Sequence, residues 1–164
     1  MTLTNPSTLT KIPTVRNLRE AARIAHTYDA VLTVGPRADE VAHFDHPRHL
    51  VVTFDDVTDP RWADAPRVEQ IRRVLEWAVP IDGTLLVHCH AGISRSTACA
   101  YGIAVARGVD PVRAASELAA AHPDEPFGGR RSFFPNELIL RHLEQLLGRE
   151  DLLAAVDPHR RWEI

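Results

Sequence analysis

A cysteine and an arginine are separated by five residues in a stretch made mostly of small residues. The stretch reads His88-Cys89-His90-Ala91-Gly92-Ile93-Ser94-Arg95-Ser96. Gly92 can adopt backbone angles that other residues avoid, so such a loop can turn successive N–H groups toward one anion. The planar guanidinium of Arg95 can bind two phosphate oxygens at once. The stretch therefore predicts an anion-binding loop built from residues 90–95.

The same positive surroundings act on Cys89. A thiol beside a cation and a helix N-terminus ionises more readily, so we expect a thiolate at neutral pH. A thiolate that faces a pocket for a dianion is suited to attack a phosphoryl group and form a cysteinyl-phosphate intermediate. Arg95 and the loop amides would stabilise the charge that develops on the phosphoryl oxygens.

The flanking sequence predicts the elements that must position this loop. An apolar run at 84–88 indicates a strand, and 96–107 indicates a helix buried on nearly all sides. Further strands are predicted at 30–34 and 50–54, and further helices at 15–28, 66–79, 110–121 and 135–147. Alternating strands and helices predict a single α/β domain with a mostly parallel sheet of four to five strands, flanked by helices. Ligands bind at the carboxyl ends of such strands, where this loop lies.

Length and composition limit the alternatives. At 164 residues the chain is expected to be one domain, 14–155, with an extended arm at 1–13 and a tail at 156–164. A net charge of −3 argues against nucleic-acid binding. The longest apolar run, 98–106, is far shorter than the roughly 20 residues of a membrane span. Two cysteines and no signal-peptide pattern suit a reducing compartment, so we expect a cytoplasmic protein.

The stretch His88-Cys89-x5-Arg95-Ser96 resembles the signature of the protein tyrosine phosphatase superfamily, and HCHAGISRS resembles its small dual-specificity branch. Lys11 is the only lysine, which is typical of a GC-rich bacterial genome and favours a bacterial type. The resemblance implies a cysteine-dependent phosphatase of phosphotyrosine, with phosphoserine and phosphothreonine in proteins as further substrates. It implies no cofactor and no metal. Phosphate, vanadate and tungstate are the expected inhibitors.

The resemblance also assigns roles residue by residue. Cys89 is similar to the nucleophile, Arg95 to the phosphate clamp, and Ser96 to the hydroxyl that assists breakdown of the intermediate. His90, Ala91, Gly92, Ile93 and Ser94 correspond to the phosphate-binding loop. His88 resembles the residue that tunes the thiolate, and Asn136, after Pro135, resembles an asparagine that supports the loop.

The resemblance further implies a general acid on a loop that follows an upstream strand. The pattern Val52-x-Phe54-x-Asp56 favours Asp56, with Asp55 as the alternative acid and Asp59 as a third candidate. Protonation of the leaving group by such an acid accelerates the reaction about 10²–10⁴-fold.

Other interpretations stay open at this point. The substrate could be a non-protein phosphate ester such as a phosphoinositide, or the chain could be a phospho-binding module without turnover. A sulfurtransferase or an arsenate reductase also uses a cysteine in an anion loop. Cys99 could form a regulatory disulfide with Cys89, and Arg130 and Arg131 could meet a phosphorylated substrate. Metal-like histidines occur at 88 and 90 and at 43, 46 and 49.

Overall fold

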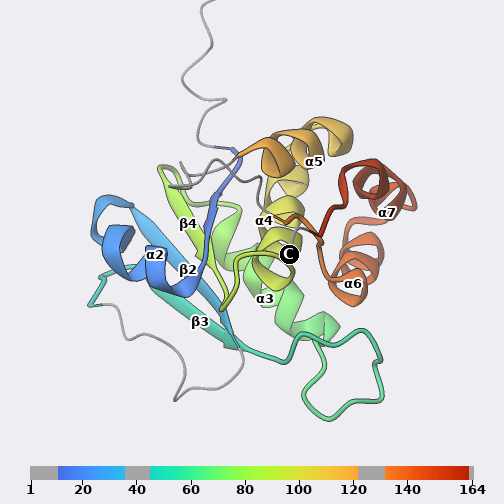
Figure 1. The fold of residues 1–164 in the computed structure, drawn as a ribbon, viewed down its shortest axis with the longest axis horizontal. Coiled ribbons are helices and arrows are strands. Elements are labelled where there is room, and N and C mark those ends of the chain that lie inside the picture. The colour runs from blue at the N-terminus through green and yellow to red at the C-terminus, as the bar shows by residue number, and fades with distance from the viewer. Residues whose placement is uncertain (1–10, 36–44, 122–131, 163–164) are drawn as a thin grey trace, which may run out of the picture.

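The computed structural model describes residues 11–35, 45–121 and 132–162. Within these residues, parallel strands form one sheet in the order β1-β4-β2-β3 (Figure 1). The strands are β1 (Thr14–Arg16), β2 (Ala30–Gly35), β3 (His49–Thr53) and β4 (Leu85–His88). The predicted α/β class with a parallel sheet is confirmed, with four strands in the described part of the chain.

The burial of each strand follows its place in the sheet. Every residue of β2 and β4 is buried, as expected for central strands with helices on both faces. The edge strand β3 alternates instead, with Leu50 and Val52 buried between exposed or half-buried neighbours. This pattern fixes the register of β3 on β2, because a shift by one residue would turn its apolar side chains to solvent.

Helices cover both faces of the sheet. On one face, α2 (Leu18–Ile24) and a short 3₁₀ helix (Ala25–Thr27) pack against the sheet. This layer is small, with Ala21, Ala25, Val31 and Leu86 at its core. The larger core lies on the other face, beneath α3 (Val68–Ala78), α4 (Arg95–Ala106), α5 (Pro111–Ala120), α6 (Glu137–Leu147) and α7 (Leu152–Val156). Figure 1 shows α4 at the centre of this helical layer.

Helix α4 is the central helix because its sequence is small and apolar on all sides. Its residues from Arg95 to Val105 are all buried. Gly102 lets α6 approach closely, since a Cβ at this position would overlap the side chain of Leu143. At the far end, Arg107 donates hydrogen bonds to the carbonyls of Ala78 (2.7 Å) and Ile81 (3.2 Å). The helix that begins at Arg95 is therefore held along its whole length.

The predicted helix over 15–28 is wrong at its start. Val15 lies in the edge strand β1, opposite Val87 of β4, and the helix begins only at Leu18. Asn17 caps α2 by accepting a hydrogen bond from the Glu20 N–H at 2.8 Å. A strand of three residues is too short to show a period of its own, so the apolar spacing here resembled a helix.

The chain end folds back onto the domain. Phe133 and Arg161 exchange backbone hydrogen bonds of 2.9 Å in each direction, and Val156 is fully buried. The division into an arm, a domain at 14–155 and a tail stays a prediction. Of the described helices, none combines the length and the apolar character that a membrane crossing requires.

Candidate active site

The loop between β4 and α4 lies at the carboxyl edge of the sheet and holds Cys89 in a protected position. The Cys89 side chain is buried, with 3% of its surface exposed. Its Sγ accepts a hydrogen bond from the Gly92 N–H at 3.2 Å and lies 3.1 Å from Ser96 Oγ. One N–H donor and one hydroxyl thus lie against the same sulfur at the start of a helix, an arrangement that suits a negative charge there.

The turn between β1 and α2 clamps the loop from outside. Gly92 has φ +72°, and a Cβ at this position would come within 2.8 Å of the Asn17 nitrogen. The Leu18 N–H donates to the His90 carbonyl at 3.1 Å. Glycine is therefore required at 92 for both its backbone angle and its close approach. Of the other loop residues, His90 and Ala91 are exposed, and Ile93 and Ser94 are half-buried.

Arg95 is positioned from inside the protein. Its side chain is buried, and its Nη1 donates to the Phe54 carbonyl at 2.9 Å, just before the acidic pair. Its Nε is also buried and has no hydrogen-bond partner among the described residues. A buried N–H without an acceptor costs about 1–3 kcal/mol, so this nitrogen is a donor suited to an anionic ligand.

Asp56 is the carboxylate that the structure brings to the loop. Its Oδ1 accepts hydrogen bonds from Ser94 Oγ (2.7 Å) and Asn136 Nδ2 (2.8 Å). These two donors leave Oδ2 as the oxygen that can carry a transferable proton. The side chain is otherwise exposed.

The other two carboxylates are placed differently. Asp59 forms an exposed ion pair with Arg61 at 2.8 Å, and the hydrogen bonds of Arg61 hold the pKa of Asp59 below its ordinary value. Asp59 therefore stays ionised and is a poor proton donor. Asp55 is half-buried and its N–H donates to the Asp64 carbonyl at 2.7 Å, a contact within its own loop.

Asn136 links the two loops. Its N–H donates to the Ser94 carbonyl at 3.1 Å, while its side-chain amide reaches Asp56 as described. Its Oδ1 accepts the Ile139 N–H at 3.1 Å and so caps α6. The buried Asn136 therefore links Asp56, the loop at 89–95 and helix α6.

A hydrogen-bond chain behind the loop includes two residues that the sequence did not reveal as part of the site. His88 Nε2 lies 2.6 Å from Thr33 Oγ1, which lies 2.7 Å from His49 Nε2. His88 Nδ1 lies 3.4 Å from the Cys89 carbonyl, an acceptor, so this nitrogen carries the proton. Thr33 then donates to His88 and accepts from His49. The sequence held two signals for this chain: a threonine within the apolar run of β2, and His49, which resembled a metal ligand only.

Burial lowers the pKa of His88 to about 4, an effect that the neighbouring His49 strengthens and the Cys89 carbonyl opposes. His88 is therefore neutral at physiological pH. A neutral imidazole holds the backbone behind Cys89 without adding charge to the interior.

The alternative roles weighed from the sequence find little support in the contacts. Cys99 is buried in α4, and burial, together with the nearby Cys89, raises the pKa of its thiol. His46 hydrogen-bonds the Tyr28 carbonyl at 2.7 Å. No group of three His, Cys, Asp or Glu residues in the described ranges is arranged to hold a metal ion. Arg130, Arg131 and His43 lie outside the described residues.

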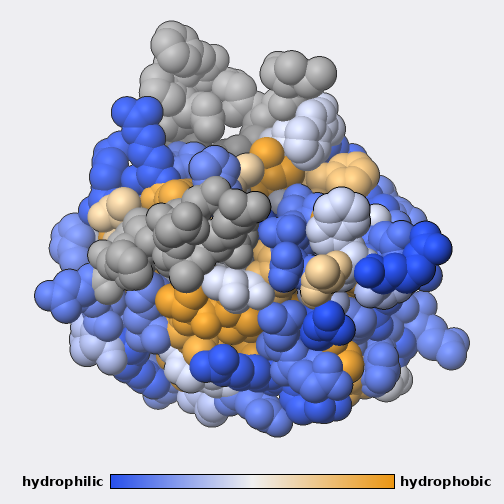
Figure 2. Space-filling model, turned by 90° about the horizontal axis from the view of Figure 1, so that it is seen from below, coloured by the Kyte–Doolittle hydropathy of each residue, from blue (hydrophilic) through white to orange (hydrophobic). Residues whose placement is uncertain are grey.

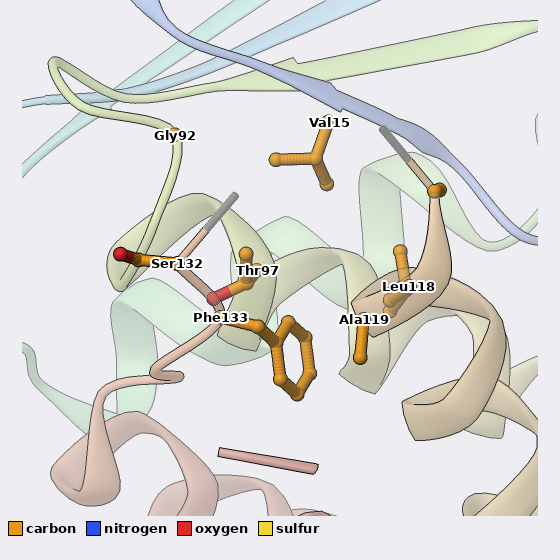
Figure 3. A pocket seen from close by; sticks show the side chains of 8 residues that line it. Val15, Gly92, Thr97, Leu118, Ala119, Ser132 and Phe133 are labelled. Atoms are coloured by element: carbon orange, nitrogen blue, oxygen red, sulfur yellow. The ribbon is translucent and has the colours of Figure 1, made fainter. Parts of the chain in front are cut away.

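A small pocket lies on the inner side of the loop (Figure 3). It is lined by Val15, Gly92, Thr97, Leu118, Ala119, Ala121, Ser132 and Phe133. It has room for about one water molecule, which is too little for a substrate. Thr97, one of the lining residues, donates to the Ile93 carbonyl at 2.6 Å. The residues around this pocket therefore hold the backbone of the loop in place.

Comparisons with known proteins agree at the level of the fold. No protein-family model matches the sequence, and no curated protein is detectably similar to it. The human tyrosine phosphatase-like serine/threonine/tyrosine-interacting protein has a TM-score of 0.59 and 16% identity, over 82% of this chain and 89% of that one. Human DUSP28 has a TM-score of 0.54 and 21% identity, over 83% and 92%. A mouse putative dual specificity phosphatase complexed with zinc tungstate has a TM-score of 0.55 and 21% identity, over 94% and 96%.

The chain therefore has the fold of the small dual-specificity members of the protein tyrosine phosphatase superfamily. The resemblance seen in the sequence is confirmed at that level. The bacterial type stays a prediction, as do the catalytic roles of the individual residues.

Proposed function

We propose that this protein hydrolyses phosphate monoesters through a cysteinyl-phosphate intermediate. One observation carries the proposal: the Cys89 sulfur accepts the Gly92 N–H at 3.2 Å and lies 3.1 Å from Ser96 Oγ, at the start of α4. The buried Arg95, whose Nε has no hydrogen-bond partner in the described part of the chain, supplies the cation next to it. This combination suits a thiolate nucleophile better than a structural cysteine. Polar groups and a cation stabilise a thiolate, whereas a structural cysteine needs only apolar neighbours.

The reaction has two steps. The Cys89 thiolate attacks phosphorus, the bond from phosphorus to the ester oxygen breaks, and Asp56 gives its proton to the departing oxygen. Water then attacks the cysteinyl phosphate while Asp56 takes up a proton, and Ser96 donates a hydrogen bond to the sulfur as it leaves. Arg95 and the loop N–H groups stabilise the phosphoryl oxygens in both steps. No metal or organic cofactor takes part.

Phosphotyrosine in proteins is the proposed substrate, with phosphoserine and phosphothreonine as further ones. The five residues between Cys89 and Arg95 include no lysine, which disfavours phosphoinositides as the alternative substrate. The mouse neighbour was solved with zinc tungstate, which supports tungstate, phosphate and vanadate as expected inhibitors. We propose that the protein acts in the cytoplasm.

The test compares wild type with Cys89→Ser on p-nitrophenyl phosphate and on a phosphotyrosine peptide. Wild type should release phosphate, and an acid-quenched sample should carry a phosphate adduct on the peptide that contains Cys89. Cys89→Ser should lose turnover and keep phosphate binding. Cys99→Ser is the matched control and should keep turnover, because Cys99 lies in the core. Phosphopeptide binding without turnover in wild type would instead identify a phospho-binding module.

A further inference from the structure

An exposed aromatic surface lies next to the candidate phosphate loop. Phe134 and Trp162 are 43% and 63% exposed, and their rings meet edge to face at 6.4 Å. The guanidinium carbon of Arg160 lies 5.1 Å from the centre of the Phe134 ring. We call these three residues the aromatic shelf. Single exposed apolar residues are common on proteins, but two large rings fixed together form a surface that can bind another side chain.

The place of the shelf relates it to the candidate site. The Phe134 N–H donates to the Ile93 carbonyl at 3.1 Å, so its backbone lies against the phosphate loop. Two residues further on, Asn136 contacts both Ser94 and Asp56. The segment thus runs along the rim between the loop and the candidate acid. A group esterified to a phosphate in the loop must leave beside Asp56, and hence beside this rim.

The shelf is assembled before any substrate binds. The backbone bridge between Phe133 and Arg161 brings the chain end alongside, which places Trp162 next to Phe134. Arg160 is held by an ion pair with Asp157 at 3.0 Å. Its Nε and Nη2 are buried without hydrogen-bond partners among the described residues, and its guanidinium lies over the Phe134 ring, which attracts a cation. A preformed surface pays little ordering entropy when it binds a ligand.

The face of the molecule seen in Figure 2 is mostly hydrophilic, with an apolar area near its middle. A small phosphate ester extends little beyond the loop and Asp56. A phosphorylated polypeptide, in contrast, carries side chains on both sides of the phosphorylated residue, and these must lie across the rim.

We propose that the aromatic shelf binds an apolar side chain next to the phosphorylated residue of a protein substrate. The inference rests on the proposed function and deepens it, because it selects a polypeptide with an apolar neighbour over a small ester. The cation of Arg160 behind the ring also disfavours a basic neighbour at this position.

The test measures binding to Cys89→Ser, so that no substrate is consumed. Two fluorescent phosphotyrosine peptides are compared that differ only in carrying leucine or serine on both sides of the phosphotyrosine. The leucine peptide should bind about tenfold more tightly, since burying part of a leucine side chain gives a gain of this order. Adding Trp162→Ser or Phe134→Ser should bring the ratio of the two affinities close to one.

Val112→Ser is the matched control, because Val112 is a 57% exposed apolar residue on α5. The Val112→Ser change, added to Cys89→Ser, should leave the ratio of the two peptide affinities unchanged. Trp162 is exposed, so its variant is expected to fold, and thermal unfolding checks this. Phe134→Leu keeps the packing but removes the ring, and should reduce the ratio only in part.

Several results would overturn the proposal. One is that Cys89→Ser alone binds the leucine and serine peptides equally well. Another is that the preference for the leucine peptide remains after Trp162→Ser and after Phe134→Ser. A third is a loss of tungstate affinity in the shelf variants as large as the loss of peptide affinity, which would mean a damaged loop. A dimer in sedimentation that dissociates with Trp162→Ser would assign the shelf to a second copy of the chain. Turnover of p-nitrophenyl phosphate by the enzyme with Cys89 intact tests the proposed function separately.

Discussion

The loop that carries Cys89 and the loop that carries Asp56 meet at the same edge of the sheet, but the chain holds them differently. Cys89 and Arg95 are 3% and 7% exposed, and the backbone around them is clamped by the start of α2 and by α4. Asp56 is exposed and is held by two side-chain donors, Ser94 and Asn136. Figure 1 shows the segment between β3 and α3 projecting from the body of the protein.

The difference fits the roles that we propose for the two loops. A nucleophile and its anion cradle work best when fixed beforehand, because reorganisation during the reaction costs free energy. A proton donor must approach leaving groups of different shapes, and two hydrogen bonds can be exchanged more easily than a packed core. The comparison predicts that changes in the first loop damage folding and chemistry together, while changes around Asp56 affect chemistry alone.

The largest effect should come from Asp56→Asn. Because it removes the transferable proton, we expect kcat to fall about 10²–10⁴-fold for aryl phosphates with poor leaving groups. The loss should shrink as the leaving group improves, while thermal stability stays close to that of wild type. Asp55→Asn is the control and should have little effect. If Asp55→Asn instead causes the larger loss, the acid is Asp55.

Gly92→Ala should reduce both the stability of the protein and its turnover, because it changes the loop that carries Cys89. The added Cβ meets backbone atoms of Arg16 and Asn17, and the N–H that reaches the Cys89 sulfur must move. We expect turnover to fall about 10²–10³-fold, as for the loss of a preorganised donor, with lower thermal stability.

Gly148→Ala is the matched control for this change. Gly148 also has a positive φ, +62°, but nothing lies within 4 Å of an added Cβ. Only the backbone strain remains, which costs about 1 kcal/mol, and activity should be kept. Equal losses of activity in both variants would contradict the proposed clamp at Gly92.

His88 should make stability depend on pH. Its pKa is about 4 in the folded protein against about 6.5 when unfolded, so the unfolded chain binds the proton more tightly. Stability from this group is present above pH 6.5 and is lost as the pH falls toward 4. The shift corresponds to about 3 kcal/mol in the free energy of unfolding.

Urea unfolding between pH 7 and pH 4 measures this effect as the difference between wild type and His88→Asn. A direct check that needs no variant is the NMR titration of the His88 ring in wild type. An unchanged ring signal down to about pH 5 is expected, and a midpoint near 6.5 would contradict the burial argument.

The smallest effect should come from Ser94→Ala, which removes one of the two donors to Asp56. A hydrogen bond that orients a side chain contributes up to about 1.5 kcal/mol, so kcat should fall by up to about tenfold. The fall should be greater for poor leaving groups, because only their departure depends on a placed proton. Thr97→Val is the control. It removes the hydrogen bond to the Ile93 carbonyl and does not touch Asp56, so its effect should not depend on the leaving group.

Most elements could be predicted because their signals are local. The strands predicted at 30–34, 50–54 and 84–88 and the helices predicted at 66–79 and 135–147 end within one or two residues of β2, β3, β4, α3 and α6. The edge strand β1 was missed, since its three residues become a strand only by pairing with β4. The aromatic shelf could not be predicted either, because Phe134 and Trp162 are far apart in the chain and meet through the bridge between Phe133 and Arg161.

The sequence by itself determined the chemistry that this protein can attempt: a cysteine, a glycine and an arginine on one short loop between a strand and a helix. These groups are neighbours along the chain, so their spacing alone fixes what they can bind together. The hydrogen bonds that hold Asp56 and the chain from His49 through Thr33 to His88 were decided only by the tertiary structure. Each of those contacts joins segments that are distant in sequence, and only the packing of the sheet and its helices brings them within hydrogen-bond distance.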